Sequence, residues 1–145
     1  MGMTITEKIL ASHAGLPKVE PGDLVECRVD MLFANDITAP LAIQQFERIG
    51  VDRVFDPDRV AFVLDHYSPS KDIASAEQCR ITREFVRKHG LPHFYDVGRA
   101  GIAHVLLAEE GFVAPGELFV GADSHTCNHG ALGCLLYTSP SPRDS

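Results

Sequence analysis

The sequence contains no tryptophan and little cysteine. Its four thiols stand at Cys27, Cys79, Cys127 and Cys134. No two of them form a Cys-x-x-Cys pair, which excludes a zinc ribbon and a thioredoxin-like motif. Reduced and partly buried thiols are the expected state of such scattered cysteines in a cytosolic protein.

Basic residues and long hydrophobic runs are also missing. Lys and Arg number 13 against 20 Asp and Glu, a formal net charge of -7, and no basic cluster is present that would neutralise a run of phosphates. We therefore expect no nucleic-acid partner. No apolar run approaches the roughly 20 residues of a membrane helix, and no basic segment followed by an apolar one opens the chain. The sequence predicts a cytoplasmic protein without a membrane partner.

The composition is that of one ordinary soluble domain. Hydrophobic residues make up 45% of the chain and charged residues 23%, which excludes disorder, collagen and coiled coil. Residues 134–145, however, break this composition abruptly and continue no helix or strand pattern. They resemble a translated sequencing adapter. We expect residues 134–145 to be a non-native tail that includes Cys134, and residues 1–133 to be the beginning of a longer domain.

Helical and strand patterns alternate along residues 1–133. A capping box of Thr4 and Glu7 predicts a short helix that ends at Gly15. Alternating polarity predicts a strand with one exposed face over Leu24–Met31, and the unbroken apolar run Val60–Leu64 predicts a strand covered on both faces. The other predicted elements are helices between Thr38 and Gly50, from about Lys71 to His89 with Ser70 as cap, and after Gly101, and strands at 93–97 and 117–121. This alternation is typical of an α/β domain with a mainly parallel sheet.

Polar residues follow two of the predicted strands. Asp65 and His66 come directly after one, residues 123–125 follow another, and His104 stands near the start of a helix. Ligands of open α/β sheets bind beyond the carboxyl ends of the strands, so these side chains are expected to face one crevice. An imidazole beside a carboxylate has the defined tautomer and raised basicity that acid–base catalysis near neutral pH requires. Each group taken alone also fits a structural role, as a turn residue or a core histidine.

Three kinds of chemistry fit these residues to different degrees. A Ser-His-Asp hydrolase is disfavoured because Asp123, Ser124 and His125 are consecutive and no Gly-x-Ser-x-Gly elbow is present. A mononuclear zinc site of His66, His104 and His125 is chemically possible. The third possibility is acid–base chemistry on a hydroxy acid at a metal centre whose ligands lie elsewhere. The residue pattern alone does not choose among them, and it assigns no role to His13, His89, His93 and His129.

The segment Gly121-Ala-Asp-Ser-His-Thr-Cys-Asn-His-Gly-Ala-Leu-Gly133 resembles the aconitase superfamily, specifically the isopropylmalate dehydratase large subunits with their homoaconitase and dimethylmalate dehydratase relatives. The resemblance extends over residues 3–133. The other motifs that carry it, in the family's order, are Thr4-Ile-Thr-Glu-Lys-Ile-Leu10, Asn35-Asp-Ile-Thr-Ala-Pro40, Asp65-His66, Gly101-Ile-Ala-His-Val105 and Glu110-Gly-Phe-Val-Ala-Pro-Gly116.

The resemblance implies a layered α/β/α fold and a hydro-lyase that removes and re-adds water across a hydroxy dicarboxylic acid at a [4Fe-4S] cluster. In the isopropylmalate branch, 2-isopropylmalate becomes 3-isopropylmalate in leucine biosynthesis, and a separate small subunit is the partner. Homoaconitate hydratase and 2,3-dimethylmalate dehydratase are the alternatives within the family. A non-catalytic metal- or carboxylate-binding module is the alternative from another class.

The resemblance also implies roles for individual residues. Asn35 takes the place of a substrate-contacting polar side chain. The family's cluster cysteines, one alone and two as Cys-x-x-Cys, lie further along the chain. The resemblance therefore implies no metal ligand within residues 1–133, Cys127 included, and we expect the fragment to be inactive alone. The catalytic residues that it implies are Asp65, His66, His104, Asp123, Ser124 and His125.

Overall fold

A computed structural model describes residues 2–138 of the chain. Its centre is a five-stranded sheet in the order β3-β2-β1-β4-β5, in which every pairing is parallel. The strands are β1 (Met31–Asn35), β2 (Val60–Val63), β3 (His93–Tyr95), β4 (Leu118–Gly121) and β5 (Leu135–Thr138). The predicted α/β class with a parallel sheet is thus confirmed.

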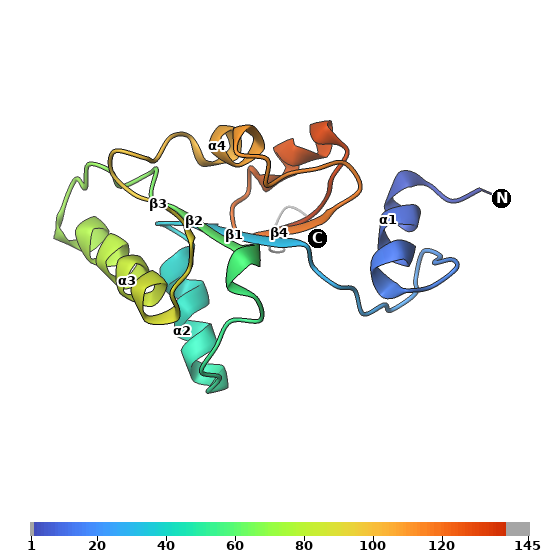
Figure 1. The fold of residues 1–145 in the computed structure, drawn as a ribbon, viewed down its shortest axis with the longest axis horizontal. Helices are drawn as coiled ribbons and strands as arrows, with labels where there is room; N and C mark the ends of the chain where they lie inside the picture. Colours follow the sequence, from blue (N-terminus) through green and yellow to red (C-terminus); the bar gives the residue numbers. More distant parts are fainter. Residues whose placement is uncertain (1, 139–145) are drawn as a thin grey trace.

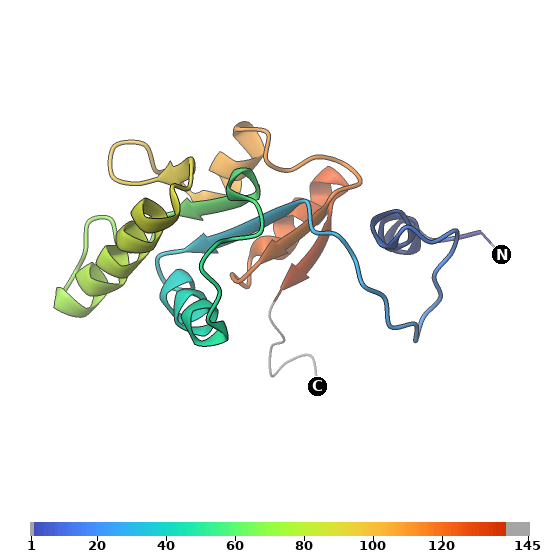
Figure 2. The same ribbon diagram turned by 60° about the horizontal axis from the view of Figure 1, so that its bottom comes forward.

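Helices lie on both faces of the sheet, which makes three layers. Helices α2 and α3 cover one face, and α4 lies on the opposite side (Figure 1). Helix α1 lies apart from these layers, past β4, in both ribbon views (Figure 2). The helices are α1 (Ile5–Ala14), α2 (Ala39–Ile49), α3 (Ile73–His89) and α4 (Ala103–Glu109), with 3-10 turns η1 (Pro57–Arg59) and η2 (Thr126–Leu132).

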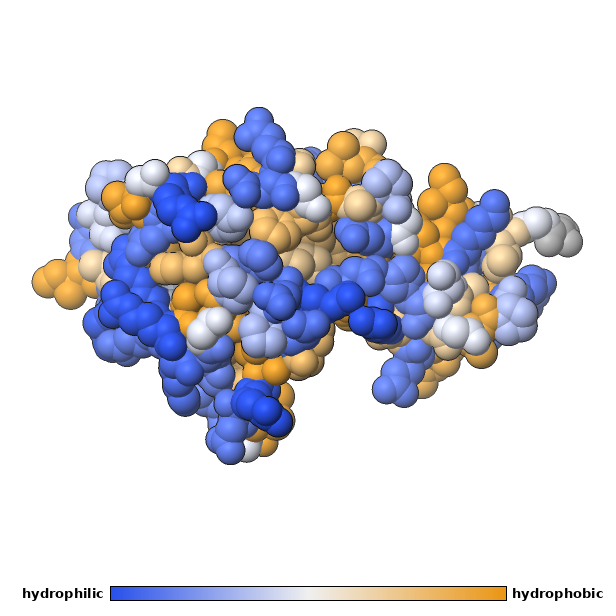
Figure 3. Space-filling model, in the orientation of Figure 1, coloured by the Kyte–Doolittle hydropathy of each residue, from blue (hydrophilic) through white to orange (hydrophobic). Residues whose placement is uncertain are grey.

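Each face of the sheet has its own hydrophobic core. Phe33 and Phe119 pack with Leu107 of α4 on one face, whereas Phe62 packs with Phe85 of α3 on the other. Both faces of the central strands are therefore covered, as expected of a parallel sheet. Hydrophobic residues still interrupt the polar surface in several places, including over α1 (Figure 3). Within residues 2–138, no helix combines the length and the apolar character needed to cross a bilayer.

The predicted strand at Leu24–Met31 is wrong. The chain over residues 24–30 forms no strand, and β1 begins only at Met31. Alternating polarity favours an extended backbone, but a strand also needs hydrogen-bonded neighbours. Both neighbours of β1, the strands β2 and β4, pair with residues 31–35. The apolar residues of the alternation, Val25, Cys27 and Val29, are only half-buried, so the alternation marks a partly covered segment and not a strand of the sheet.

The cap predicted for the long helix is also displaced. Asp72 caps α3, and its side chain and that of Ser75 accept each other's backbone N–H groups. Ser70 instead donates its hydroxyl to the carbonyl of Tyr67. A carboxylate next to the helical residues satisfies the free N–H groups and the positive end of the helix dipole better than a hydroxyl further upstream. The capping box of Thr4 and Glu7 is confirmed.

The segment after Gly133 contains a strand, contrary to the expectation that it carries no regular structure. Leu135–Thr138 form β5 alongside β4, and Cys134, directly before β5, is buried. The run Leu-Leu-Tyr-Thr is rich in residues that suit a strand, so it can extend an open sheet edge. Residues 139–145 of the expected tail lie outside the described residues. The boundary at Gly133 stays a prediction.

Asp30, directly before β1, attaches α1 to the sheet. Its carboxylate accepts the N–H of Leu118 at 2.9 Å and pairs with the ring of His13 on α1 and with Arg59. Burial alone would raise the pKa of Asp30, but the hydrogen bonds from Leu118, His13 and Arg59 outweigh it and lower the pKa. His13 therefore has a structural partner.

The side chain of Thr126 lies so close to Gly121, the last residue of β4, that only a residue without a side chain fits there. A Cβ placed there would lie 2.5 Å from both Oγ1 and Cγ2 of Thr126, which is completely buried. We expect Gly121→Ala to lower the free energy of unfolding by about 1–3 kcal/mol because the core cannot take the extra methyl without shifting. Urea unfolding measures the change.

Gly130→Ala is the matched control, since a Cβ at Gly130 meets no atom within 4 Å. Equal stability of Gly121→Ala and Gly130→Ala would contradict the packing argument.

Candidate active site

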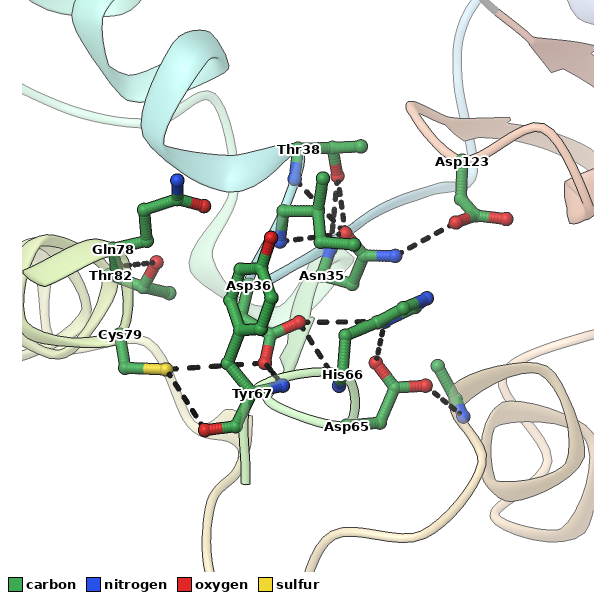
Figure 4. A network of polar contacts seen from close by, with 12 residues as sticks. Asn35, Asp36, Thr38, Asp65, His66, Tyr67, Gln78, Cys79, Thr82 and Asp123 are labelled. Carbon is green, nitrogen blue, oxygen red and sulfur yellow. Dashed lines mark hydrogen bonds and ion pairs between the residues drawn. The ribbon is translucent and has the colours of Figure 1, made fainter. Parts of the chain in front are cut away.

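The carboxyl ends of three adjacent strands bring the predicted residues together. Asn35 and Asp36 lie at the end of β1, Asp65 and His66 follow β2, and Asp123 follows β4. Because β1 lies between β2 and β4 and all three are parallel, these ends meet at one edge of the sheet. Figure 4 shows the resulting network around the end of β1.

Asp65 and His66 form a hydrogen-bonded pair with a fixed orientation. The Nδ1 atom of His66 lies 2.7 Å from Oδ1 of Asp65. The other oxygen of Asp65 accepts the N–H of Ala103 at 2.9 Å, where α4 begins. The Asp65 side chain is 12% exposed and that of His66 is 39% exposed. The ring is therefore held through Nδ1, and its Nε2 edge is the part left for a ligand.

His104 and Asp123 form a second pair on the other side of β1. Nε2 of His104 lies 3.0 Å from Oδ1 of Asp123, and the imidazole packs edge-on against Phe33. His104 is more enclosed than His66, with a side chain that is 14% exposed. The ring of His129 also contacts it, and a nitrogen of His129 lies 3.2 Å from the His104 carbonyl.

Hydrogen bonds keep the Asp123 carboxylate ionised despite its burial. Burial alone would raise the pKa of Asp123, but the N–H of His125, the His104 ring and the Asn35 amide all donate to it, and together they lower the pKa. The carboxylate is thus a fixed negative charge at the end of β4.

Asn35, expected to contact substrate, is completely buried. Its amide nitrogen donates to Oδ2 of Asp123 at 2.8 Å, and its amide oxygen accepts the N–H groups of Ile37 and Thr38 at the start of α2. Thr38 also donates its hydroxyl to the same oxygen instead of capping α2 itself. In this structure Asn35 positions Asp123. Its contact with substrate stays a prediction.

Ser124 and His125 lie on the surface of the site. The side chain of His125 is 75% exposed. The Ser124 hydroxyl lies 3.5 Å from Nδ1 of His125, and the Asp123 carboxylate lies 3.3 Å from the same nitrogen. A catalytic triad needs the serine and the aspartate on opposite ring nitrogens. This geometry therefore excludes a triad made of these three residues.

Asp36 is a residue of the site that the sequence pattern did not indicate. Its carboxylate is completely buried and accepts the N–H groups of His66 at 3.2 Å and Tyr67 at 2.6 Å. The signal that could have revealed it is its place at the end of a strand, the same criterion that singled out Asp65 and Asp123. The misplaced boundary of the first strand hid this position.

The three-histidine zinc site is not formed. In the described part of the chain, the metal-ligand atoms that come within 4.8 Å of one another in a set of three or more belong to Asp36, Asp65 and His66. His104 and His125 have ring centroids 6.5 Å apart, and neither belongs to that set.

The cysteines of residues 2–138 do not fit an iron–sulfur cluster. They stand on separate parts of the fold, and their thiols contact four different carbonyls, those of Leu10, Tyr67, Ser124 and Glu117. Cys79 and Cys134 are buried, and burial raises the pKa of both thiols, which opposes the thiolate form that ligates iron. The position of the cluster ligands outside residues 1–133 stays a prediction.

Comparison with known proteins identifies the family. Residues 7–137 match the aconitase family (aconitate hydratase). The chain belongs to the aconitase family. This confirms the resemblance found in the motifs, and the layered parallel sheet is in keeping with it.

The similar curated proteins are large subunits of one kind of enzyme within this family. A 3-isopropylmalate dehydratase large subunit of Moorella thermoacetica is 62% identical over 135 residues, which are 93% of this chain and 32% of the relative. Proteins of the same name are 58% identical in Thermodesulfovibrio yellowstonii, with the same shares, and 60% identical in Aquifex aeolicus, over 93% of this chain and 31% of the relative. The chain thus spans about a third of the length of these relatives.

The lowered pKa of Asp123 predicts a pH-dependent contribution to stability. Its folded pKa lies below the unfolded value of about 3.9. The contribution is therefore complete above the unfolded pKa and is lost as the pH falls through the folded pKa. We expect the free energy of unfolding to fall more steeply toward acid in the unmodified chain than in Asp123→Asn, which is measured by urea unfolding at a series of pH values.

Asp52→Asn, at an exposed loop position, is the control and should leave the acid slope unchanged. Parallel slopes for the unmodified chain and Asp123→Asn would contradict the argument.

Proposed function

We propose that this chain is the N-terminal part of the large subunit of a hydro-lyase that converts 2-isopropylmalate into 3-isopropylmalate by dehydration and rehydration, as in leucine biosynthesis. The observation that carries the proposal is the 58–62% identity, over 93% of the chain, to proteins named 3-isopropylmalate dehydratase large subunit. The paired histidines and carboxylates at the carboxyl edge of the sheet support it.

In this proposal His66 holds the proton that the departing hydroxyl requires. Asp65 accepts a hydrogen bond from Nδ1 of the ring, which sets the orientation of the ring; in the acid step the ring is an imidazolium, and its Nε2–H faces the substrate and gives its proton to the departing hydroxyl. The bond from the Ala103 N–H keeps Asp65 in place. The chain thus provides both the acid group and the carboxylate that orients it.

The second pair orients the substrate. Asp123 is held by His104, Asn35 and the N–H of His125, and it fixes the loop that carries Ser124 and His125. These two exposed side chains offer a hydroxyl and an imidazole to a small hydroxy-dicarboxylic acid. A buried anchor with exposed donors suits recognition of an anionic substrate.

The complete enzyme needs groups that residues 2–138 do not provide. We propose that it uses a [4Fe-4S] cluster whose cysteine ligands lie in the part of the large subunit that corresponds to the rest of the relatives' length. We also propose a small subunit as its partner, as the name "large subunit" of the relatives suggests.

Substrate choice by the complete enzyme tests this proposal. The full-length large subunit, expressed with its small subunit and kept anaerobic, is assayed with 2-isopropylmalate, homoaconitate and 2,3-dimethylmalate. Ultraviolet absorbance follows the carbon–carbon double bond, which forms when either malate loses water and disappears when homoaconitate is hydrated. We expect kcat/KM to be highest for 2-isopropylmalate. A higher value for either of the other acids would overturn the assignment.

The role of the first pair predicts a specific kinetic defect. We expect His66→Asn and Asp65→Asn in the complete enzyme to lower kcat by about 10²- to 10⁴-fold, the usual contribution of a positioned general acid or base. KM should change little. Steady-state kinetics with 2-isopropylmalate measures both constants.

His93→Asn is the matched histidine control, because the His93 ring packs against Phe112 rather than against the site. Loss of activity in His93→Asn as large as in His66→Asn, or near-normal kcat in His66→Asn, would refute the assigned role.

A further inference from the structure

We propose that Asp36 is the positioning residue of the Asp65–His66 pair. Its buried carboxylate fixes the backbone at His66 and Tyr67, so that the imidazole meets its ligand in one orientation. The catalytic consequence of this positioning rests on the proposed function, whereas the positioning itself is a property of the chain.

The contacts of Asp36 are directed at the loop that carries His66. Oδ1 accepts the N–H of His66 at 3.2 Å, and Oδ2 accepts the N–H of Tyr67 at 2.6 Å. Two consecutive N–H groups held by one carboxylate fix the orientation of the peptide plane between them. The thiol of Cys79 lies behind this arrangement, 4.0 Å from Oδ2 of Asp36 and 3.8 Å from the Tyr67 carbonyl. Figure 4 shows these contacts on the side of His66 away from Asp123.

Because Asp36 is buried, its carboxylate needs these hydrogen bonds. Asp36 is completely buried, and a buried carboxylate is costly unless hydrogen bonds or an opposite charge compensate it. In residues 2–138, the ionisable partner paired with it is His66, whose Nδ1 lies 3.5 Å from Oδ1. The backbone N–H groups of His66 and Tyr67 also donate to the carboxylate and offset the cost of burying its charge. The Asp36 carboxylate and the loop therefore depend on each other.

Asp36 also acts separately from Asp65. Asp65 holds the His66 ring and is itself anchored on α4 through Ala103. Asp36, directly after β1, accepts the backbone N–H of His66 at 3.2 Å and lies 3.5 Å from Nδ1 of the ring. The imidazole is thus fixed at both ends of its side chain, and removing Asp36 frees one end while the Asp65 contact can persist.

The neighbouring residue extends this arrangement to the second pair. Asn35 donates to Asp123, and Asp36 accepts from His66 and Tyr67. Two consecutive residues at the end of β1 thus hold the two pairs of the site, the one that follows β2 and the one whose aspartate follows β4.

Kinetics of the complete enzyme test the catalytic consequence. We expect Asp36→Asn to lower kcat by about 10- to 100-fold, as small misplacements of catalytic groups do, and to change KM by less than about 3-fold. Asn has the size of Asp, but its amide NH₂ group is a donor and cannot accept one of the two backbone N–H groups, those of His66 and Tyr67, that Asp36 accepts. Thr82→Val is the control: it removes an equally buried polar group that bonds only the Gln78 carbonyl, and it should leave kcat unchanged.

Nuclear magnetic resonance of the 145-residue chain tests the positioning independently of activity. We expect Asp36→Asn to shift the backbone amide signals of His66 and Tyr67 and the ¹⁵N ring signals of His66, and to leave those of His104 in place. Unchanged His66 signals in a folded Asp36→Asn chain would overturn the proposal.

If Asp36→Asn does not fold, amide hydrogen exchange of the unmodified chain tests the proposal. In the unmodified chain, the amide protons of His66 and Tyr67 should exchange with solvent well below the intrinsic rate; exchange at that rate would overturn the proposal. If these signals behave as expected but the complete enzyme acts on none of the three acids, the positioning stands and the proposed function fails.

Discussion

The parallel pairing of β1 with β2 on one side and β4 on the other is the constraint on which the rest of the structure depends. Parallel neighbours must end at the same edge of a sheet, and the crossover helices must then cover both faces. The registers Asn35 with Val63 and Phe33 with Gly121 bring Asp65 and Asp123 to opposite sides of the end of β1. Without that pairing, Asp65 and Asp123 would lie in unconnected turns and would not form one site.

The charges of the site are balanced mainly by backbone and amide N–H groups rather than by lysine or arginine. Asp36, Asp65 and Asp123 each accept at least one backbone N–H, and their ionisable partners are the two histidines of the site and His125. Backbone dipoles are fixed by the fold and do not reorganise when a ligand binds, so the carboxylates keep their geometry.

Much of the fold could be predicted from the sequence because local signals were strong. The Thr4–Glu7 capping box and the run Val60–Leu64 each specify one structure locally. The first strand could not be located from polarity alone, since its position depends on two neighbours distant in sequence. For the site, strand ends pointed to Asp65, His66 and Asp123, and the glycine turn pointed to His104. Asp36 escaped because the first strand was expected to end at Met31, whereas it ends at Asn35, and because the loop that Asp36 holds lies 30 residues away in sequence.

The two histidines of the site are held by opposite ring nitrogens, His66 through Nδ1 and His104 through Nε2. They are therefore chemically inequivalent before any substrate arrives. An acylating or alkylating reagent that attacks the free nitrogen of an accessible imidazole would meet Nε2 of His66, whereas the remaining nitrogen of His104 is enclosed in the protein. A covalent inhibitor designed for this edge of the sheet would thus reach His66 and the exposed His125 but not His104, and selectivity against His104 would come from steric access.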